Sequence, residues 1–245
     1  MSELPLHCEI GPLQRVFGVV CVVGAAGLVA WQLARLLTTS GVFRWWIVLI
    51  VAAGMLFADL VSGILHWSAD TWGSESMPII GKRFLEPFRI HHVNPDDFLR
   101  REFFDVNGDV AMICAALLAA VFWIPLDSGW GRAWAVFMVS FIIVALPTNQ
   151  VHQWAHMRRP PAWVRWLQQR RVILDRDEHK LHHRAPYATH YCIATGWWNG
   201  LLGYVDFFRR AERAVTLLTG LTPRQDDDAF LAQVAKSGGQ HGGAR

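Results

Sequence analysis

The stretch WWIVLIVAAGMLFADLVSGILHWSAD (residues 45–70) joins a long apolar run to the polar pair His66 and Asp70. About 20 residues of such composition cross the hydrocarbon layer of a bilayer as a helix, and the run from Trp45 to Leu65 is long enough. His66 and Asp70 stand four residues apart, so a continuing helix places both side chains on one face. The stretch therefore predicts a membrane-spanning helix that delivers two polar side chains at its end.

Three further apolar segments are typical of membrane spans. They run from about Val16 to Leu37, from about Val110 to Leu126 and from about Ala133 to Pro147. The whole chain is 53% hydrophobic, contains thirteen tryptophans and has only 18% charged residues, a composition that favours a membrane protein over a soluble one. We therefore expect an all-α integral membrane protein with about four transmembrane helices.

The composition divides the chain into three parts. Residues 1–15 form an N-terminal segment, residues 16–210 the membrane domain, and residues 211–245 a C-terminal tail. Thr222 and Pro223 have the pattern of a helix start. The glycine-rich ending SGGQHGGAR predicts partial disorder, and His241 within it has no expected role.

The connections between the spans differ in length and in charge. Only short links join the first span to the second and the third to the fourth, whereas about forty residues separate the second from the third. Lysines and arginines gather in that long middle loop and after the fourth span, so the positive-inside rule places both regions on the cytoplasmic side. The expected location is a multi-pass position in a bacterial inner membrane, or in the endoplasmic reticulum of a eukaryote. The net charge of +3 and the lack of a basic module argue against a nucleic-acid partner.

This topology puts nine histidines on one side of the membrane, in what we expect to be a cytoplasmic, histidine-rich cap. They are His66, His91, His92, His152, His156, His179, His182, His183 and His190. His152 and His156 form an HxxxH pattern at the end of the fourth span, and the stretch HKLHH (residues 179–183) places three imidazoles within two helical turns. Four separate segments thus offer two or three ligand atoms each from the same side.

So many imidazoles favour a metal centre over isolated structural histidines. Neutral imidazole suits zinc, copper and iron, but one catalytic zinc uses only about three protein ligands. Two irons match the set better, and the four cysteines form no cluster that indicates an iron–sulfur centre. A bis-histidine haem protein and a non-catalytic membrane metal carrier remain alternatives, and a pH-sensitive histidine scaffold is a further one. Iron that activates O2 can attack an unactivated lipid chain, and the electrons would come from an external donor.

Several positions keep two interpretations. Asp70 is either a metal ligand or a group that orients the imidazole of His66. Asp59, within the second span, is explained by a buried hydrogen bond or by a span boundary in a different place. The amphipathic stretch from Trp163 to Leu174 lies either in the membrane interface or against the rest of the domain.

The middle loop carries a second set of polar side chains. They form either a network around the metals or an ordinary solvated loop, and they are Asn94, Asp96, Asp97, Arg100, Arg101, Asp105 and Asn107.

Four blocks of the sequence resemble the Kua/CarF family of lipid desaturases, whose best-known members are plasmanylethanolamine desaturases. The blocks are GILHWSADTWG (63–73), FRIHHVNPDDFLRREFFDVNGD (88–109), NQVHQWAHM (149–157) and HKLHHRAPYATHYCIATGWWNG (179–200). The resemblance covers roughly residues 45–205. One departure is Tyr187, where animal members have a histidine, and His190 stands where they have an aromatic residue.

The resemblance implies a four-span lipid desaturase domain with a non-haem di-iron centre. It implies O2-dependent desaturation of the sn-1 alkyl chain of an ether phospholipid, plasmanylethanolamine, to the vinyl ether of a plasmalogen. A fatty-acyl phospholipid desaturase of the same mechanism is the alternative, and the expected electron donor is a cytochrome b5- or ferredoxin-type protein. The expected catalytic and metal-binding residues are His66, Asp70, His91, His92, His152, His156, His179, His182 and His183, with His190 as a further candidate metal ligand.

Overall fold

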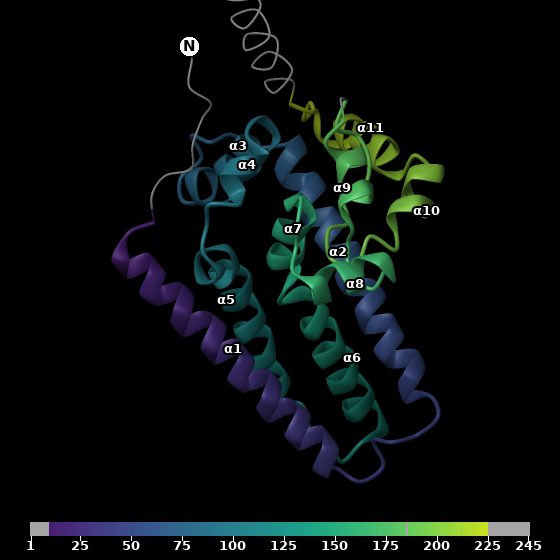
Figure 1. Cartoon of the computed structure of the whole chain (residues 1–245). Helices are drawn as coiled ribbons and strands as arrows, with labels where there is room; N and C mark the ends of the chain where they lie inside the picture. Colours follow the sequence, from purple (N-terminus) through teal and green to yellow (C-terminus); the bar gives the residue numbers. More distant parts are fainter. Residues whose placement is uncertain (1–9, 185, 225–245) are drawn as a thin grey trace, which may run out of the picture.

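The computed structural model describes residues 10–184 and 186–224. Within these residues every regular element is a helix. Four long helices lie side by side, and the shorter helices gather at one of their ends as a cap (Figure 1). The long helices are α1 (Pro12–Thr38), α2 (Ile47–Thr71), α5 (Phe103–Phe122) and α6 (Gly129–Ala145).

The four long helices are apolar and long enough to cross a membrane, the fourth together with its continuation α7. The predicted all-α membrane fold with four spans is therefore confirmed. Helix α2 continues to Thr71, so His66 and Asp70 lie on its last turns, as predicted for a helix that continues past the apolar run. The predicted start of the third span was wrong. Helix α5 begins at Phe103 and not at Val110.

The early start of α5 corrects the prediction that Asp105 and Asn107 lie in a loop. Both residues are in the first turns of the helix, where one polar atom of each side chain has a partner. The carboxylate of Asp105 accepts from the guanidinium of Arg15 at 3.0 Å. The amide Nδ2 of Asn107 donates to the carbonyl of Phe103 at 2.8 Å. Because Asp105 Oδ2 and Asn107 Nδ2 have these partners, a membrane helix can begin at these polar residues.

Small residues let the long helices approach closely at two crossings. A Cβ atom at Gly18 of α1 would lie 2.7 Å from the carbonyl oxygen of Phe104 in α5. A Cβ atom at Gly54 of α2 would lie 2.6 Å from the carbonyl oxygen of Phe137 in α6. Such contacts bring backbones together where lipid provides no hydrophobic driving force. The bundle is thus assembled as two close pairs, α1 with α5 and α2 with α6.

The cap consists of short elements that follow the spans. They are the π-helix Gly81–Leu85, α3 (Glu86–Val93), α4 (Pro95–Phe98), α7 (Thr148–His156), α8 (Ala162–Gln169), α9 (Arg176–His182), α10 (Asn199–Tyr204) and α11 (Phe207–Thr219). Helix α7 follows α6 after a break at Leu146 and Pro147, where proline cannot supply a helical N–H group. This break separates the span α6 from the part of the chain that carries His152 and His156.

Asp59 is fully buried and joins the cap to α2. Its Oδ1 accepts from the backbone N–H groups of Thr195 at 2.7 Å and Gly196 at 3.0 Å, and its Oδ2 from that of Trp198 at 3.3 Å. The indole of Trp198 also donates to the carbonyl of Leu56 at 2.8 Å. A buried hydrogen-bond network is therefore the correct one of the two interpretations of Asp59.

Helix α8 contains the start of the predicted amphipathic stretch. Val164 is buried against the protein, whereas Trp163 and Trp166 expose more than half of their surface. One face of α8 therefore packs on the domain, and the other remains available to the surroundings.

Near the C-terminus, residues 220–224 after α11 are not helical. The rest of the predicted tail, with His241, lies outside the described residues.

Candidate metal centre

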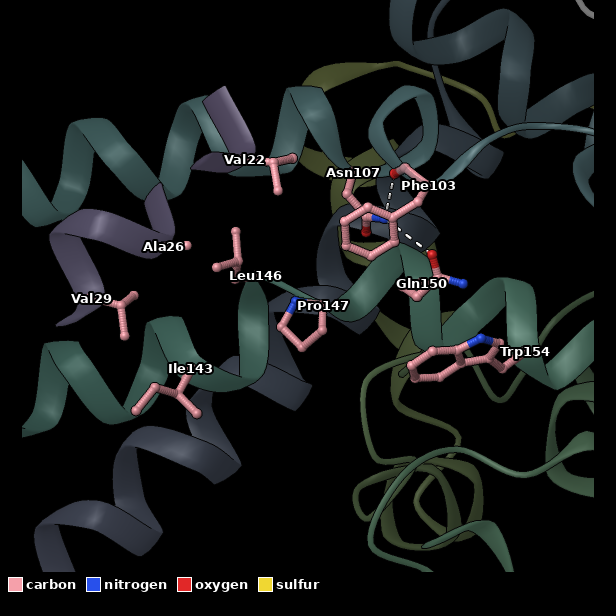
Figure 2. Close-up of a pocket in the computed structure, with 10 residues that line it drawn as sticks. All are labelled: Val22, Ala26, Val29, Phe103, Asn107, Ile143, Leu146, Pro147, Gln150 and Trp154. Atoms are coloured by element: carbon pink, nitrogen blue, oxygen red, sulfur yellow. Dashed lines mark hydrogen bonds between the residues drawn. The ribbon is translucent and has the colours of Figure 1, made fainter. Parts of the chain in front are cut away.

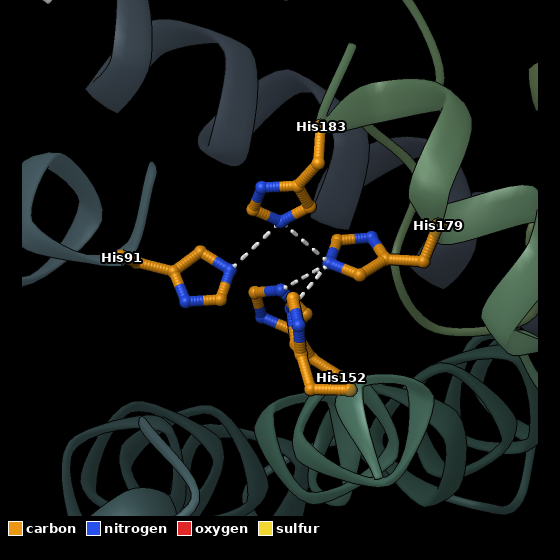
Figure 3. A group of neighbouring side chains, drawn as sticks. His91, His152, His179 and His183 are labelled. Carbon is orange, nitrogen blue, oxygen red and sulfur yellow. Dashed lines mark hydrogen bonds between the residues drawn. The ribbon is translucent and has the colours of Figure 1, made fainter. Parts of the chain in front are cut away.

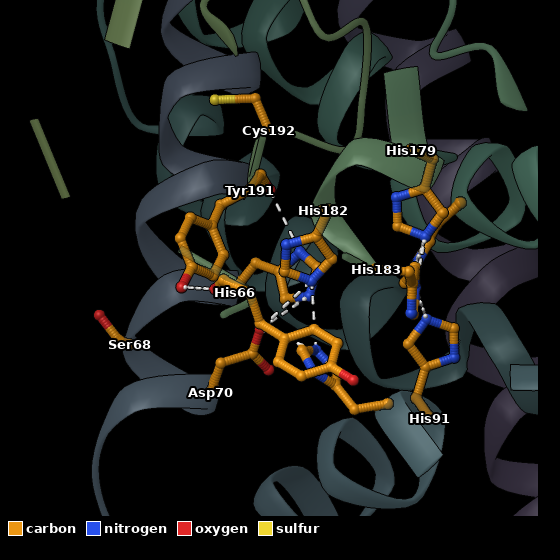
Figure 4. Close-up of polar contacts among 12 residues, drawn as sticks. His66, Ser68, Asp70, His91, His179, His182, His183, Tyr191 and Cys192 are labelled. Atoms are coloured by element: carbon orange, nitrogen blue, oxygen red, sulfur yellow. Dashed lines mark hydrogen bonds and ion pairs between the residues drawn. The ribbon is translucent and has the colours of Figure 1, made fainter. Parts of the chain in front are cut away.

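Nine of the ten candidate ligands converge in two groups at the junction between the spans and the cap (Figures 3 and 4). The five-histidine group consists of His91, His152, His156, His179 and His183. The aspartate group consists of His66, Asp70, His92 and His182. Within each group, one ligand atom from every residue lies within 4.8 Å of the others.

The two histidine pairs of adjacent residues each divide between the groups. His91 and His183 join the five-histidine group, while His92 and His182 join the aspartate group. Neighbouring residues on a helix point in different directions, so one HH pair serves two centres. Asp175 fixes the start of α9, because its carboxylate accepts from the N–H groups of residues 177 and 178 at 2.8 and 2.9 Å.

The five-histidine group is a set of Nε2 atoms that face one another. The Nε2 atom of His179 lies 2.6 Å from that of His156, 2.9 Å from that of His152 and 3.0 Å from that of His183. The Nε2 atoms of His183 and His91 are 3.1 Å apart. Adjacent nitrogen ligands of one metal ion are separated by about 3 Å when each metal–nitrogen bond is about 2.1 Å. The spacing therefore fits a cation at the centre.

The aspartate group has a carboxylate oxygen at its centre. Asp70 Oδ2 lies 3.0 Å from Nε2 of His92, 3.3 Å from that of His66 and 3.5 Å from that of His182. The other ring nitrogens of His66 and His182 face the backbone carbonyls of Tyr191 and Thr189, both at 3.1 Å.

These two carbonyls determine the tautomers of the rings. A carbonyl only accepts, so Nδ1 of His66 and of His182 carries the proton, and Nε2 of each neutral ring keeps its lone pair. Lone pairs that face the Asp70 carboxylate repel it unless a cation lies between them. Such carbonyl-to-imidazole contacts typically orient histidines that bind metals.

Burial keeps the cap histidines in the form that metals require. It lowers the pKa of His91 and of His179 well below the usual value for imidazole, and it also lowers the pKa of His182. The neighbouring histidines lower the pKa of His91 and His179 further, because a second positive charge would repel the first. The rings are therefore neutral at physiological pH, so each retains a lone pair for a metal. Both groups fit one divalent cation each.

His190 is the candidate ligand that the structure leaves outside both groups. Its Nε2 lies 3.5 Å from a carboxylate oxygen of Glu178, and its backbone adopts a positive φ of 61°. Its ring therefore lies beside Glu178 of α9, while Thr189 and Tyr191 on either side provide the carbonyls that orient His182 and His66.

The positioning carbonyls were not foreseen from the sequence. A backbone carbonyl has no residue-type signal, so only the fold reveals that the stretch 189–191 holds two imidazoles. The contact between Tyr187 and His92, whose ring centroids are 5.0 Å apart, was likewise not foreseen.

The middle loop packs against the five-histidine group. The ring of Phe98 packs against His91 and His152, with centroids 5.3 and 5.2 Å away. Gln153 Nε2 donates to the carbonyls of Phe98 and Arg101 at 2.9 and 3.0 Å, which fixes α4 on α7. Asp97, also buried, lies 3.3 Å from Arg100. The loop thus supports the group through the Phe98 ring and through backbone carbonyls, while Asp97 pairs with Arg100 within the loop.

Two cavities lie near the groups, on different sides of them. An apolar groove of about 420 Å³ runs between α1, α5 and the α6–α7 junction and is lined by Val22, Ala26, Ile143 and Trp154, among others (Figure 2). Trp154 lies on the opposite face of α7 from His152 and His156, so the groove backs the five-histidine group.

The second cavity is smaller and polar. Its volume is about 60 Å³, and it opens beside Asp70 and His92. Tyr187, Arg209 and Arg224 are among the other residues that line it.

Comparison with known sequences assigns the chain to a family. Residues 55–226, more than half of the chain, match the lipid desaturase domain. The chain belongs to the lipid desaturase family. This lipid desaturase is 40% identical over 232 residues to the plasmanylethanolamine desaturase of Myxococcus xanthus, a match that covers 93% of the chain and 82% of that relative. No solved structure matches it.

Two eukaryotic relatives show the breadth of the lipid desaturase family. The chain is 39% identical over 223 residues to plasmanylethanolamine desaturase 1 of Mus musculus, covering 87% of the chain and 81% of the relative. It is 34% identical over 176 residues to the chloroplastic fatty acid desaturase 4 of Arabidopsis thaliana, covering 70% of the chain and 52% of the relative. The predicted family and the prediction of a lipid desaturase are confirmed, so a non-catalytic metal or haem carrier is set aside.

Proposed function

We propose that this lipid desaturase removes two hydrogens from the sn-1 alkyl chain of plasmanylethanolamine, between its first two carbons, and so forms the vinyl ether of a plasmalogen. The observation that carries the proposal is the convergence of eight histidines and Asp70 in two cation-sized groups at the end of four membrane spans. A bond near the lipid headgroup lies at that depth. The similarity to plasmanylethanolamine desaturases over most of the chain supports this substrate.

The two groups are proposed to hold one iron each. Neutral imidazoles with a single carboxylate suit iron, and the lone pairs that face one another in each group require a cation. When bound, the irons supply the oxidising power that attacks an unactivated C–H bond with O2. The protein orients the ligands through the Thr189 and Tyr191 carbonyls and excludes bulk water, since six of the nine ligand residues are buried.

The overall reaction requires electrons from outside the chain. One O2 is reduced to two waters, for which the alkyl chain gives two electrons with two protons. The other two electrons come from a donor, and the other two protons from solvent. The sequence carries no haem or dinucleotide motif for this purpose, so we propose a cytochrome b5- or ferredoxin-type protein as the donor. It would dock at the cap, which we expect to lie on the cytoplasmic side because lysines and arginines gather there.

A fatty-acyl phospholipid desaturase is the second candidate function. The 34% identity to the plant fatty acid desaturase favours it. Both candidates use the same ligands and the same external donor, and they differ in whether the reacting chain is joined through an ether or through an ester.

Lipid analysis of a host that makes alkyl ether phospholipids tests the proposal. The wild-type chain should produce acid-labile vinyl ethers, and the purified protein should contain about two irons. His152→Ala should abolish the product. A new acyl double bond without vinyl ether would favour the second candidate, and protein that holds only zinc and consumes no O2 would refute both.

A further inference from the structure

Arginines surround the solvent-facing edge of the five-histidine group. His156 and His183 are the two members of this group that are partly exposed, and the other three are buried. Arg158 and Arg159 follow His156 after the end of α7, and both are exposed. Arg184 directly follows His183 and is also exposed. Each exposed ligand of the group therefore has arginines beside it in the chain.

Helix α9 extends this positive charge along one side. Arg176, Lys180 and Arg184 stand four residues apart, so they share one side of the helix and of the turn that follows it. One turn after Arg176 comes His179, whose Nε2 lies 2.6 Å from Nε2 of His156. The end of α7 thus meets α9 in the cap, and the basic residues of both helices lie around one edge of the group (Figure 1).

The carboxylates of this part of the chain do not cancel its positive charge. Residues 156–184 include eight lysines and arginines but only three aspartates and glutamates. Asp175 caps the N-terminus of α9, and Asp177 pairs with Lys180 at 2.7 Å. Glu178 lies 3.5 Å from His190. Four arginines around this edge form no ion pair with any described residue, and we call them the basic face: Arg158, Arg159, Arg176 and Arg184.

Other basic parts of the cap do not combine unpaired charge with an exposed ligand. In the middle loop, Asp96 and Asp97 offset Arg100 and Arg101. Helix α11 has several arginines but contributes no residue to either metal group. The basic face is therefore the positively charged surface that lies nearest to the exposed edge of a metal group.

The basic face lies beyond the hydrocarbon layer. The fourth span and its continuation run from Gly129 to His156, a length of 28 residues. At a rise of about 1.5 Å per residue this length is about 42 Å, roughly 12 Å more than the hydrocarbon thickness. The exposed Trp130 at the start of the span fits the aromatic belt of the opposite interface. His156 and the arginines after it therefore lie at the outer edge of the headgroup region, where a soluble protein reaches them.

We infer that the basic face is the docking site of an acidic electron-carrier protein. The inference rests on the proposed function, whose reaction requires two electrons from outside the chain. Electron transfer becomes slower with distance, so a carrier is best placed against the exposed edge of a metal ligand. Complementary charges steer such a partner to its site and orient it before contact. Lipid phosphates suit this face less well, because the headgroup layer extends only about 5 to 7 Å beyond the hydrocarbon.

Affinity measurements on the intact protein in nanodiscs of neutral lipid test the inference. The probes are a soluble cytochrome b5 domain and a ferredoxin, both of them acidic. Arg158→Glu combined with Arg159→Glu should weaken binding of the carrier about 10-fold or more at low salt, the lower end of the effect of charge steering. Arg184→Glu, beside the other exposed ligand, should weaken it to a smaller extent. Both differences should shrink in about 1 M salt, where the screening length is only about 3 Å.

The matched control reverses two arginines of α11, which changes the net charge by the same amount. Arg210 is exposed, and Arg213 forms only an exposed pair with Asp206 at 3.4 Å. Arg210→Glu combined with Arg213→Glu should bind the carrier as the wild-type protein does. An equal loss of affinity in this control would assign the effect to net charge and overturn the inference.

The rate of iron reduction separates docking from a structural role. Photoreduced deazariboflavin is small and uncharged, so it should reduce the wild-type protein and all variants at the same rate. The carrier protein should reduce the Arg158→Glu/Arg159→Glu variant about 10-fold more slowly than wild type. If this variant is reduced more slowly by both reductants, or holds less iron, the arginines are structural and the inference is wrong. A loss that appears only in phosphatidylglycerol vesicles, with either reductant, would assign the face to anionic lipid instead.

These outcomes are distinguishable from a failure of the proposed function. Binding and reduction are measured without substrate, so they do not depend on whether the reacting chain is an ether or an ester. If deazariboflavin reduces the wild-type protein and neither carrier binds or reduces it, the docking face is wrong while the desaturase function stands. If the wild-type protein holds no reducible iron, the proposed function fails, and the docking face fails with it.

Discussion

The two metal groups are neighbours, yet different parts of the chain hold them. The five-histidine group takes its ligands from the cap helices α3, α7 and α9 and from His183, directly after α9. The Nδ1 atoms of His91 and His179 are buried and have no hydrogen-bond partner among the described residues. The aspartate group includes the end of the span α2, and the loop that follows α9 orients two of its imidazoles through carbonyls.

Helix packing thus places the ligands of the five-histidine group, whereas backbone hydrogen bonds place two ligands of the aspartate group. The loop 189–198 runs along α2. Its carbonyls accept hydrogen bonds from His66 and His182, and its N–H groups donate to Asp59. The five-histidine group has more ligands but no comparable restraint on the rings of His91 and His179. We therefore expect the aspartate group to depend on the loop and the five-histidine group to depend on its own imidazoles.

The largest effect should come from His179→Ala, which removes the imidazole closest to the others in the five-histidine group. We expect the iron content to fall from about two to about one per chain. Vinyl-ether formation should decrease by at least about 100-fold, since even a loss of groups that support a ligand costs 10- to 100-fold. Metal analysis of the purified protein and lipid analysis measure the two effects. His190→Ala is the control and should keep both irons, and an equal loss in both variants would place His190 among the ligands.

Asp59→Leu should weaken metal binding in the aspartate group and leave the five-histidine group unchanged. The substitution leaves three backbone N–H groups without their carboxylate, so the free energy of unfolding should decrease by about 3 kcal/mol or more. In a chelator competition, one iron should leave much faster than in wild type, while the other leaves at its usual rate. Ser62→Ala, which removes a single hydrogen bond from Ile193, should have a smaller effect of the same kind. Equal acceleration for both irons would mean that the loop supports the whole centre.

Gly63→Ala should produce the smallest effect at the contact between the loop 189–198 and α2. An added Cβ would lie 2.4 Å from the Sγ atom of Cys192 and would push the loop away from α2. Overpacking of this kind costs about 1 to 3 kcal/mol, which thermal unfolding in detergent can measure. Gly24→Ala is the matched control in α1, where a Cβ meets nothing within 4 Å. If both variants unfold at the same temperature, the close approach of loop and helix is not important for stability.

Much of the fold could be predicted from apolar segment lengths. The bounds were less certain, because polar residues within a span have no visible partner in the sequence. Asp105 and Asn107 were placed in a loop, but inside α5 Asp105 Oδ2 accepts from Arg15 and Asn107 Nδ2 donates to the carbonyl of Phe103. Asp59 could not be interpreted for the same reason, since its partners are backbone N–H groups more than a hundred residues away.

The sequence by itself determined the helical membrane fold and the set of histidines on one side of it. Both follow from local properties, namely the length of apolar runs and the spacing of ligands along a helix. Only the tertiary structure decided how the adjacent histidines divide between two groups, and which carbonyls orient them. It also brought Arg224 back to the end of α2 and left His190 outside both groups. Such contacts depend on how distant segments pack, and no local pattern encodes that packing.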